Sequence, residues 1–208
     1  MIKKLVILLL LIVPVSLFSQ NIDIRILRSL NSPGNQSSDN FFKFASNSYS
    51  EVIFGIPVTM GMVGLIKHDN ELLRNACVII VANGINLGVT TALKYSINRK
   101  RPYETYPDIT KKSGGGNPSF PSGHASSAFA TATSLSLAYP KWYVIVPSYL
   151  WASTVGYSRL QLGVHYPSDV LGGMIVGAGS AWLSYKANIW LKHYYAKKHE
   201  MSNKKEKL

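Results

Sequence analysis

The sequence predicts an all-α helical bundle in a membrane, and three observations support this class. Apolar residues make up 47% of the 208 residues and charged residues only 15%, whereas an ordinary soluble domain carries about 25% charged residues. Strand-like alternation is absent, and the apolar segments have the lengths of helices. These segments are residues 50–66, 73–97, 123–139, 142–157 and 168–191. We expect about five to six membrane-spanning helices in all.

Residues 1–19 have the layout of a secretory signal peptide or an N-terminal anchor. Two lysines precede a short apolar run from Leu5 to Phe18, which is the order found in a signal peptide. Leu17 stands where a small residue usually precedes cleavage, so removal and retention both stay open. In either case the segment that follows is expected outside the cytoplasm.

Residues 20–49 are expected to form an extracytoplasmic N-terminal segment. It is polar and contains the turn signal Asn31-Ser-Pro-Gly-Asn35. A short amphipathic helix is predicted to begin after Ser38 and to carry the three phenylalanines between residues 41 and 44. The main helical domain is expected to follow at residues 50–192.

Alternating helices give the bundle a predicted topology. The connections at 67–72 and 140–141 and the basic C-terminal tail at 193–208 lie inside, where the positive-inside rule expects their lysines and arginines. The connections at 98–122 and 158–167 then lie outside. The first of these also carries a basic cluster, which topology does not explain and which therefore indicates a function.

Two features bear on whether the bundle spans a membrane. The segments 123–139 and 142–157 are short for spans and contain Ser, Thr and Pro, so a soluble periplasmic bundle stays open as an alternative. Gly173 and Gly177 in the last segment form a G-x-x-x-G pattern, which permits two helices to pack closely in a membrane.

Lys94 and Arg101 form the first of three polar clusters at the expected outer helix ends. Their spacing is nearly two helical turns, so the two side chains are predicted to share one helix face. Pro102 is predicted to end that helix. Two cations pointing the same way would clamp an anion; an ordinary basic helix end is the alternative interpretation.

The second cluster is Pro121-Ser122-Gly123-His124. Ser122 is a natural helix cap, and Gly123 allows a ligand to approach the backbone. A helix start offers free N–H groups and a positive dipole end, which suit phosphate. His124 in the first turn could donate a proton to a leaving group; a capped helix with a surface histidine is the alternative.

The third cluster is Ser158-Arg159-x5-His165-x3-Asp169. Pro167 is expected to open the last helix, which brings Asp169 close to His165. A carboxylate beside a histidine fixes its tautomer and makes the other ring nitrogen a better nucleophile. The planar fork of Arg159 suits phosphate oxygens. A structural Arg–Asp pair with an incidental histidine is the alternative interpretation.

Asp169 is the only acidic residue between Gly123 and Leu191. Ionisable groups are costly in such an apolar region and tend to be functional. The single acid also follows one of only two histidines there by four residues. A purely structural origin of all three clusters is therefore disfavoured.

Together the clusters resemble the signature of the type-2 phosphatidic acid phosphatase family, K-x6-RP, PSGH and SR-x5-H-x3-D, at every position from Lys94 to Asp169. The resemblance implies the helical bundle that this family shares with vanadate-dependent haloperoxidases. It also implies that His165 attacks phosphorus, that Asp169 orients it, and that His124 protonates the leaving oxygen and later activates water. The residues that would hold the phosphoryl oxygens are Lys94, Arg101, Ser122, Gly123 and Arg159.

The predicted function is a metal-independent phosphatase that hydrolyses phosphate mono- or pyrophosphate esters of lipids through a phosphohistidine. Implied substrates are phosphatidic acid, phosphatidylglycerol phosphate, undecaprenyl pyrophosphate and lipid A phosphates. Specificity is expected to reside in residues 20–49 and the long loop at 102–120. The expected location is a bacterial inner membrane with a periplasmic active site, and a soluble periplasmic acid phosphatase of broad specificity is the alternative.

We expect no cofactor and no metal, because three basic side chains and a helix start can replace a metal ion and no carboxylate cluster is visible. The expected partners are a phosphorylated lipid and membrane lipids. No nucleic-acid motif and no obligate protein partner is evident. A vanadate-dependent haloperoxidase and a non-enzymatic membrane scaffold are the remaining alternatives.

Overall fold

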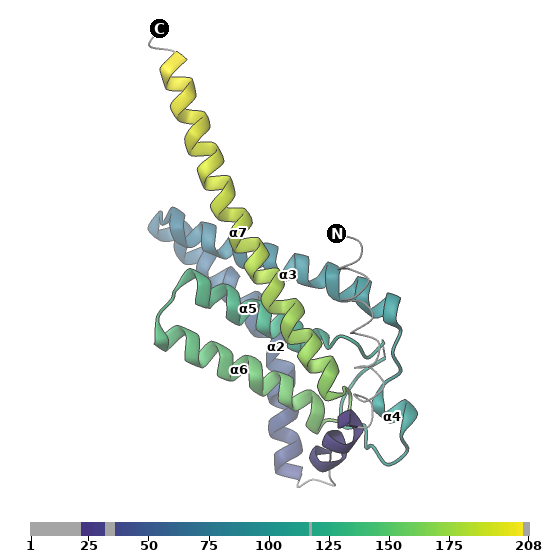
Figure 1. Cartoon of the computed structure of the whole chain (residues 1–208). Coiled ribbons are helices and arrows are strands. Elements are labelled where there is room, and N and C mark those ends of the chain that lie inside the picture. The colour runs from purple at the N-terminus through teal and green to yellow at the C-terminus, as the bar shows by residue number, and fades with distance from the viewer. Residues whose placement is uncertain (1–21, 32–35, 117, 206–208) are drawn as a thin grey trace, which may run out of the picture.

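The computed structural model describes residues 22–31, 36–116 and 118–205, and these form a helical bundle without strands (Figure 1). One helix covers residues 22–30. The others are α2 (Gln36–Lys67), α3 (Asn70–Ile97), α4 (Pro102–Thr105), α5 (Gly123–Ala138), α6 (Trp142–Gln161) and α7 (Pro167–Lys205). The predicted all-α class is confirmed, and five of these helices contain the five apolar segments.

The N-terminal part is more helical than the sequence predicted. Residues 22–30 form a helix, with Ile24 and Leu27 buried at 5% and 0% exposure on one face. The expected short helix after Ser38 begins instead at Gln36 and continues without a break to Lys67, because no turn signal interrupts the chain there. The signal or anchor at 1–19 lies outside the described residues.

The end of α3 corrects the prediction for the first cluster. The helix ends at Ile97, and Asn98 adopts a left-handed conformation (φ 47°, ψ 43°) while its N–H donates to the carbonyl of Lys94, since Asn tolerates this conformation. Arg101 is therefore not on the helix face of Lys94. It lies in extended backbone before Pro102, which begins α4 rather than ending α3.

Helix α5 occupies the centre of the bundle and presents small residues. Ala125, Ala128 and Ala132 have no exposed surface. Gly173 and Gly177 of α7 pack directly on α5: a Cβ at Gly173 would lie 2.6 Å from the Ser122 carbonyl oxygen, and one at Gly177 would collide with α5 backbone. The G-x-x-x-G pattern thus serves close helix contact, as predicted.

Many large apolar side chains point outward instead of into this core. Exposed examples include Phe54, Val58, Leu65, Ile80, Leu87, Trp142, Leu150, Leu171, Ile175 and Trp182. Two stretches, Gln36–Lys67 and Asn70–Thr105, are long and apolar enough to cross a membrane. Contiguous apolar surface of this extent is unusual for a soluble monomer, so the structure supports a membrane protein over the soluble alternative.

The connections between helices separate to two ends of the bundle. The short turns at 68–69 and 139–141 lie together on the left in Figure 1, and the loops at 98–122 and 162–166 lie on the right. A hydrogen bond from Asn75 to the hydroxyl of Tyr139 joins the first pair. All three predicted polar clusters are at the opposite end.

Candidate active site

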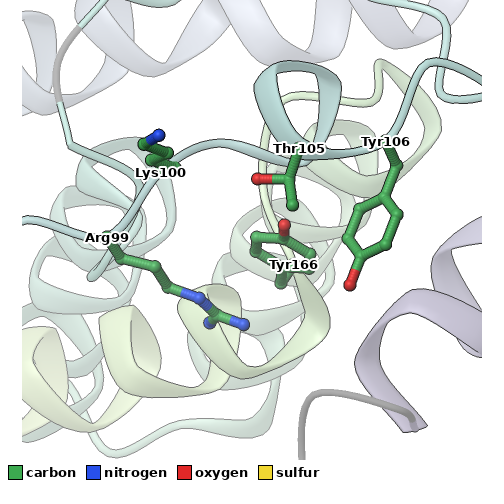
Figure 2. A pocket seen from close by; sticks show the side chains of 5 residues that line it. All are labelled: Arg99, Lys100, Thr105, Tyr106 and Tyr166. Atoms are coloured by element: carbon green, nitrogen blue, oxygen red, sulfur yellow. The ribbon is translucent and has the colours of Figure 1, made fainter.

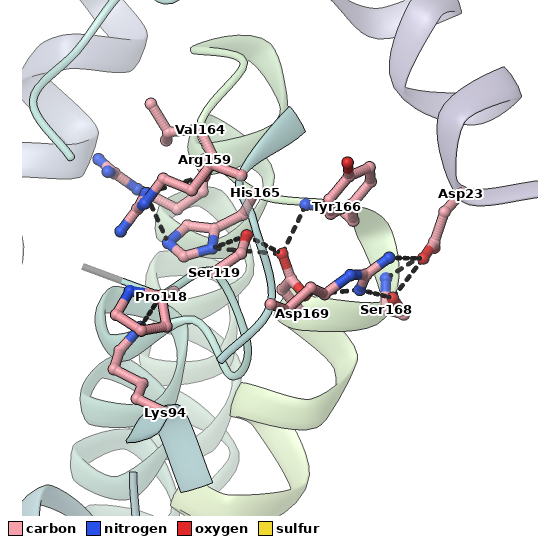
Figure 3. A network of polar contacts seen from close by, with 12 residues as sticks. Asp23, Lys94, Pro118, Ser119, Arg159, Val164, His165, Tyr166, Ser168 and Asp169 are labelled. Carbon is pink, nitrogen blue, oxygen red and sulfur yellow. Dashed lines mark hydrogen bonds and ion pairs between the residues drawn. The ribbon is translucent and has the colours of Figure 1, made fainter. Parts of the chain in front are cut away.

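His165 and Asp169 form the buried centre of the site (Figure 3). His165 is 2% exposed and Asp169 is fully buried. The first turn of α7 brings Asp169 Oδ2 to 3.5 Å from His165 Nδ1. The same Oδ2 accepts hydrogen bonds from the Ser119 hydroxyl at 2.5 Å and from the backbone N–H of Tyr166 at 2.9 Å. His165 and Asp169 therefore lie side by side, as the sequence predicted.

The surroundings of His165 keep its ring neutral near pH 7. Burial lowers the pKa of His165 to about 4; the charge of Asp169 opposes this effect, and the charges of Arg101 and Arg159 add to it. Ser119 Oγ lies 3.4 Å from Nδ1, so Nδ1 faces the Asp169–Ser119 pair. The other nitrogen, Nε2, faces the Arg101 guanidinium at 3.5 Å.

The three predicted cations reach the site from different elements. Arg101 donates to the carbonyl of Val164 at 2.8 Å. Lys94 donates from α3 to the carbonyl of Pro118 at 2.6 Å. Arg159 of α6 is 2% exposed, and its Nε has no hydrogen-bond partner among the described residues. Arg101 Nη1 lies 3.5 Å from His165 Nε2, and the Ser122 N–H donates to the Asp169 carbonyl at 2.9 Å, so the three clusters converge.

The glycine-rich part of the long loop closes over two of these cations. Arg159 donates to the Gly114 carbonyl at 3.3 Å. A Cβ at Gly115 would lie 2.6 Å from Arg101 Nη1, so only glycine fits without moving the guanidinium. Tyr103 and Lys111 hold this turn by donating to the Gly115 carbonyl. The loop at 102–120 is thus part of the site wall.

Ser122 and Gly123 begin α5 as predicted, but Ser122 does not cap the helix with its side chain. Its hydroxyl is buried and has no hydrogen-bond partner in the described part of the chain. Its N–H donates to the Asp169 carbonyl at 2.9 Å. Space is open around the Cα of Gly123. The helix start therefore keeps a free hydroxyl beside an accessible backbone.

His124 lies half-buried in the first turn of α5, against a tyrosine that the sequence did not suggest. The ring centroids of His124 and Tyr49 are 3.9 Å apart at an interplanar angle of 38°. Tyr49 belongs to α2, and Ser46 one turn earlier accepts a hydrogen bond from Arg159. Helix α2 thus supports both a predicted proton donor and a predicted phosphate ligand.

The expected alternative of a structural pair between Arg159 and Asp169 is wrong. The arginine that pairs with Asp169 is Arg99, at 2.7 Å. No sequence pattern assigns a role to Arg99 or to Ser119, because neither lies in a recognisable spacing. Their contacts depend on how the loop at 98–122 folds back on α7.

The donor types at the site suit an anion rather than a metal. Among the described residues, no group of three or more His, Cys, Asp or Glu side chains is placed to hold a metal ion. The Asp169 oxygens already accept from Ser119, Arg99 and the Tyr166 backbone. The available groups are cations and N–H or O–H donors, which match phosphoryl oxygens.

A small pocket lies beside this centre (Figure 2). It has a volume of about 140 Å³ and is lined by Arg99, Lys100, Thr105, Tyr106 and Tyr166. None of the site residues predicted from the sequence lines it. A pocket of this size does not hold a drug-sized ligand, let alone a lipid. Arg99 and Tyr166 connect it to the centre, because both line the pocket and donate to Asp169.

Several known proteins share sequence with parts of the chain. It is 42% identical over 71 residues to the lipid A 4'-phosphatase of Bacteroides thetaiotaomicron (34% of the chain, 32% of that protein). It is 29% identical over 140 residues to the undecaprenyl-diphosphatase of Sulfolobus acidocaldarius (67% and 64%). It is 39% identical over 101 residues to the lipid A 1-phosphatase of Porphyromonas gingivalis (47% and 20%). The chain thus spans less than two thirds of each relative.

Two solved structures share the bundle. The crystal structure of Aquifex aeolicus LpxE superposes with a TM-score of 0.67 at 25% identity, covering 79% of this chain and 95% of that one. That of the transmembrane PAP2-type phosphatidylglycerolphosphate phosphatase from Bacillus subtilis gives 0.71 at 22%, covering 90% and 96%. The sequence profile of the PAP2 superfamily matches residues 75–192, more than half of the chain and all three clusters. The chain belongs to the PAP2 superfamily.

Proposed function

We propose that the chain is a metal-independent phosphatase of phosphorylated lipids with His165 as its nucleophile. The observation that carries the proposal is the buried, neutral His165, with a carboxylate at Nδ1 and an arginine at Nε2. A base at one ring nitrogen orients the other for attack, and a cation there attracts a phosphoryl group. The relatives, which are named as phosphatases of lipid A and of undecaprenyl diphosphate, support the same reaction.

In the first step, Nε2 of His165 forms a bond to phosphorus while the bond from phosphorus to the leaving oxygen breaks. His124 donates its proton to that oxygen. In the second step, His124 removes a proton from water, the resulting hydroxide attacks phosphorus, and the P–N bond breaks. Inorganic phosphate leaves, and both histidines return to their starting states.

Negative charge spreads over the phosphoryl oxygens in both steps, so fixed cations and donors account for most of the acceleration. Arg159 has an unpaired Nε for this purpose, and Ser122 has an unpaired hydroxyl. Lys94 and Arg101 add positive charge from α3 and from the loop after it. The backbone N–H groups at Gly123 complete the set, since a helix start favours anions.

The proposed setting is a bacterial inner membrane with the site on the periplasmic side. The turns at the opposite end of the bundle carry Lys67, Arg74 and Lys141, and α7 carries further lysines away from the site, as expected for cytoplasmic ends. An outward-facing site among apolar helices suits amphiphiles such as phosphatidic acid, phosphatidylglycerol phosphate, undecaprenyl diphosphate and lipid A phosphates. The basic cluster at the outer end then serves catalysis.

A phosphate-release panel tests this function. Detergent-solubilised protein is given each of these lipids, with and without excess EDTA, beside a His165→Ala control. We expect release from at least one lipid, unchanged by EDTA and absent in the control. Loss of activity under EDTA with recovery on added divalent metal would overturn the metal-independent mechanism. No release from any lipid would overturn the function, and equal activity in detergent-free extract would favour a soluble acid phosphatase.

A further inference from the structure

Arg99 contacts two buried carboxylates at the site, those of Asp169 and Asp23, yet the mechanism above does not use it. Its Nη1 donates to Asp169 Oδ1 and to the Ser168 hydroxyl, both at 2.7 Å. Its Nη2 donates to Asp23 Oδ2 at 2.9 Å. The guanidinium also lies 3.9 Å from the ring centre of Tyr166. These partners hold the guanidinium from several directions.

Asp23 is a buried acid from the helix at 22–30, with only 4% of its surface exposed. Besides Arg99, it accepts hydrogen bonds from the N–H and the hydroxyl of Ser168, at the start of α7. A buried carboxylate is retained only where it is fully paired. Asp23 meets this condition through Ser168, which precedes Asp169 in the chain, and through Arg99, which pairs with Asp169. The carboxylate of Asp23 therefore joins the N-terminal helix to Arg99 and to the start of α7, which carries Asp169.

The N-terminal helix is anchored well enough to hold Asp23 in place. Ile24 and Leu27 belong to a core cluster that includes Ile109 and Leu160. Beyond the helix, Asn31 donates to the carbonyls of Thr110 and Gln161 and accepts from the Thr110 N–H. The helix is therefore fixed to both loops that form the site.

We propose that Asp23 and Arg99 are positioning residues for the phosphatase reaction: Asp23 holds Arg99, and Arg99 occupies Asp169 Oδ1 so that Oδ2 faces His165. This inference rests on the proposed function. It extends the active site to a helix that lies outside the residues 75–192 matched by the family profile. The three charges alternate from Asp23 to Arg99 to Asp169, and each one acts on the next.

The alternation predicts opposite effects of two substitutions on the protonation of His165. Arg99→Gln removes a positive charge near the dyad and should make His165 easier to protonate. Asp23→Asn removes a negative charge and should make it harder. The other charged or titratable groups that face His165 stay in place: Lys94 of α3, Arg101 of the following loop, His124 of α5, Arg159 of α6 and Asp169 of α7.

The chain offers a matched control on the same helix. Arg28 pairs with Asp108 at 2.6 Å, with both side chains about half exposed. This pair also ties the N-terminal helix to the loop at 98–122, but it does not contact Asp169. Asp108→Asn therefore tests whether the loss of any ion pair between this helix and the loop is enough to impair the site.

The experiment uses the full-length protein in detergent micelles. For Asp23→Asn and Arg99→Gln, we expect kcat to fall about tenfold or more with KM changed less than about twofold, because a misaligned dyad affects the transition state. The pKa of His165, followed by histidine NMR, should fall by about half a unit in Asp23→Asn and rise by a similar amount in Arg99→Gln. Arg99→Lys should restore the wild-type pKa, and Asp108→Asn should change neither quantity.

Wild-type kcat in both variants, or a loss in Asp108→Asn as large as in Asp23→Asn, would overturn the positioning role. Shifts of the His165 pKa in the same direction for both variants would also overturn it. A general disruption of the site would not depend on the sign of the charge removed, whereas the proposed electrostatic effect does. If the wild-type protein releases no phosphate from any lipid, the proposed function fails. The NMR titration still decides, independently of activity, whether Asp23 and Arg99 act on His165.

Discussion

The two sides of the site differ in how completely their polar atoms are paired. On the nucleophile side, both oxygens of Asp169 accept hydrogen bonds, from Arg99, Ser119 and the Tyr166 backbone. On the oxyanion side, the hydroxyl of Ser122 and the Nε of Arg159 are buried but have no partner in the described part of the chain. On the nucleophile side, the protein itself supplies hydrogen-bond partners to both Asp169 oxygens. The oxyanion side retains hydrogen-bond donors without a partner among the described residues.

An unpaired buried donor costs about 1–3 kcal/mol, so proteins keep such groups only where something else returns that energy. Under the proposed mechanism, this difference means that the nucleophile is oriented before substrate arrives, whereas the substrate completes the oxyanion side. This division is what a phosphoryl transfer by positioning and electrostatics requires. The following four predictions test each side, from the largest effect to the smallest.

His165→Ala should remove turnover altogether, a loss of about 10⁴-fold or more, because the proposed nucleophile is then missing. Phosphate release measures the rate, and circular dichroism in detergent checks that the helices remain. Retained activity in a folded variant would refute the nucleophile.

His124→Asn should lower kcat about 10²–10³-fold on lipid substrates, because the leaving alkoxide then departs without a proton. The loss should be much smaller on an aryl phosphate, whose leaving group needs no proton. Equal losses on the two substrates would show that His124 acts by binding and not as an acid.

The pH dependence should reflect the low pKa of His165, which is about 4 because the ring is buried. Attack requires the neutral ring, so kcat/KM should stay level from pH 6 down to about 5 and then fall about tenfold per unit below about 4. An ordinary histidine would already lose activity below pH 6.5. The profile is measured after correction for ionisation of the substrate phosphate; a decline beginning near pH 6.5 would contradict the buried environment.

Ser122→Ala should lower kcat/KM about tenfold without lowering stability, because the buried hydroxyl makes no cap hydrogen bond and has no partner among the described residues, so that removing it also removes the cost of burying it. Asp69→Ala is the matched control. Asp69 caps α3 by accepting from Glu71 N and Leu72 N, so this variant should lose about 1 kcal/mol of stability without losing activity. Thermal unfolding and phosphate release give the two quantities; a destabilised Ser122→Ala would mean that the hydroxyl serves the helix.

The sequence predicted those parts of the site that depend on fixed spacings between neighbouring residues. His165 and Asp169 meet because Pro167 opens a helix between them, and four residues bridge one turn. The start of α5 at Gly123 followed equally from local chemistry. The prediction that Lys94 and Arg101 share a helix face was wrong, because Asn98 ends α3 in a left-handed conformation. The two side chains approach the same centre through the fold of the loop and not through helical periodicity.

Apolar segments and their charges determined the helical class, the number of long helices and the end of the bundle that carries the site, because these depend on local propensity and on the cost of charge near lipid. Tertiary structure alone decided that Asp23, Ser46 and Tyr49 contribute to it. Those residues belong to a segment whose sequence is polar and shows no informative spacing. Packing of Ile24 and Leu27 against the loop at 98–122 and α6 places the helix that carries Asp23. Contacts of α2 with α5 and α6 place Tyr49 and Ser46. Contacts between distant segments depend on how surfaces fit once helices have formed, and no local pattern encodes that fit.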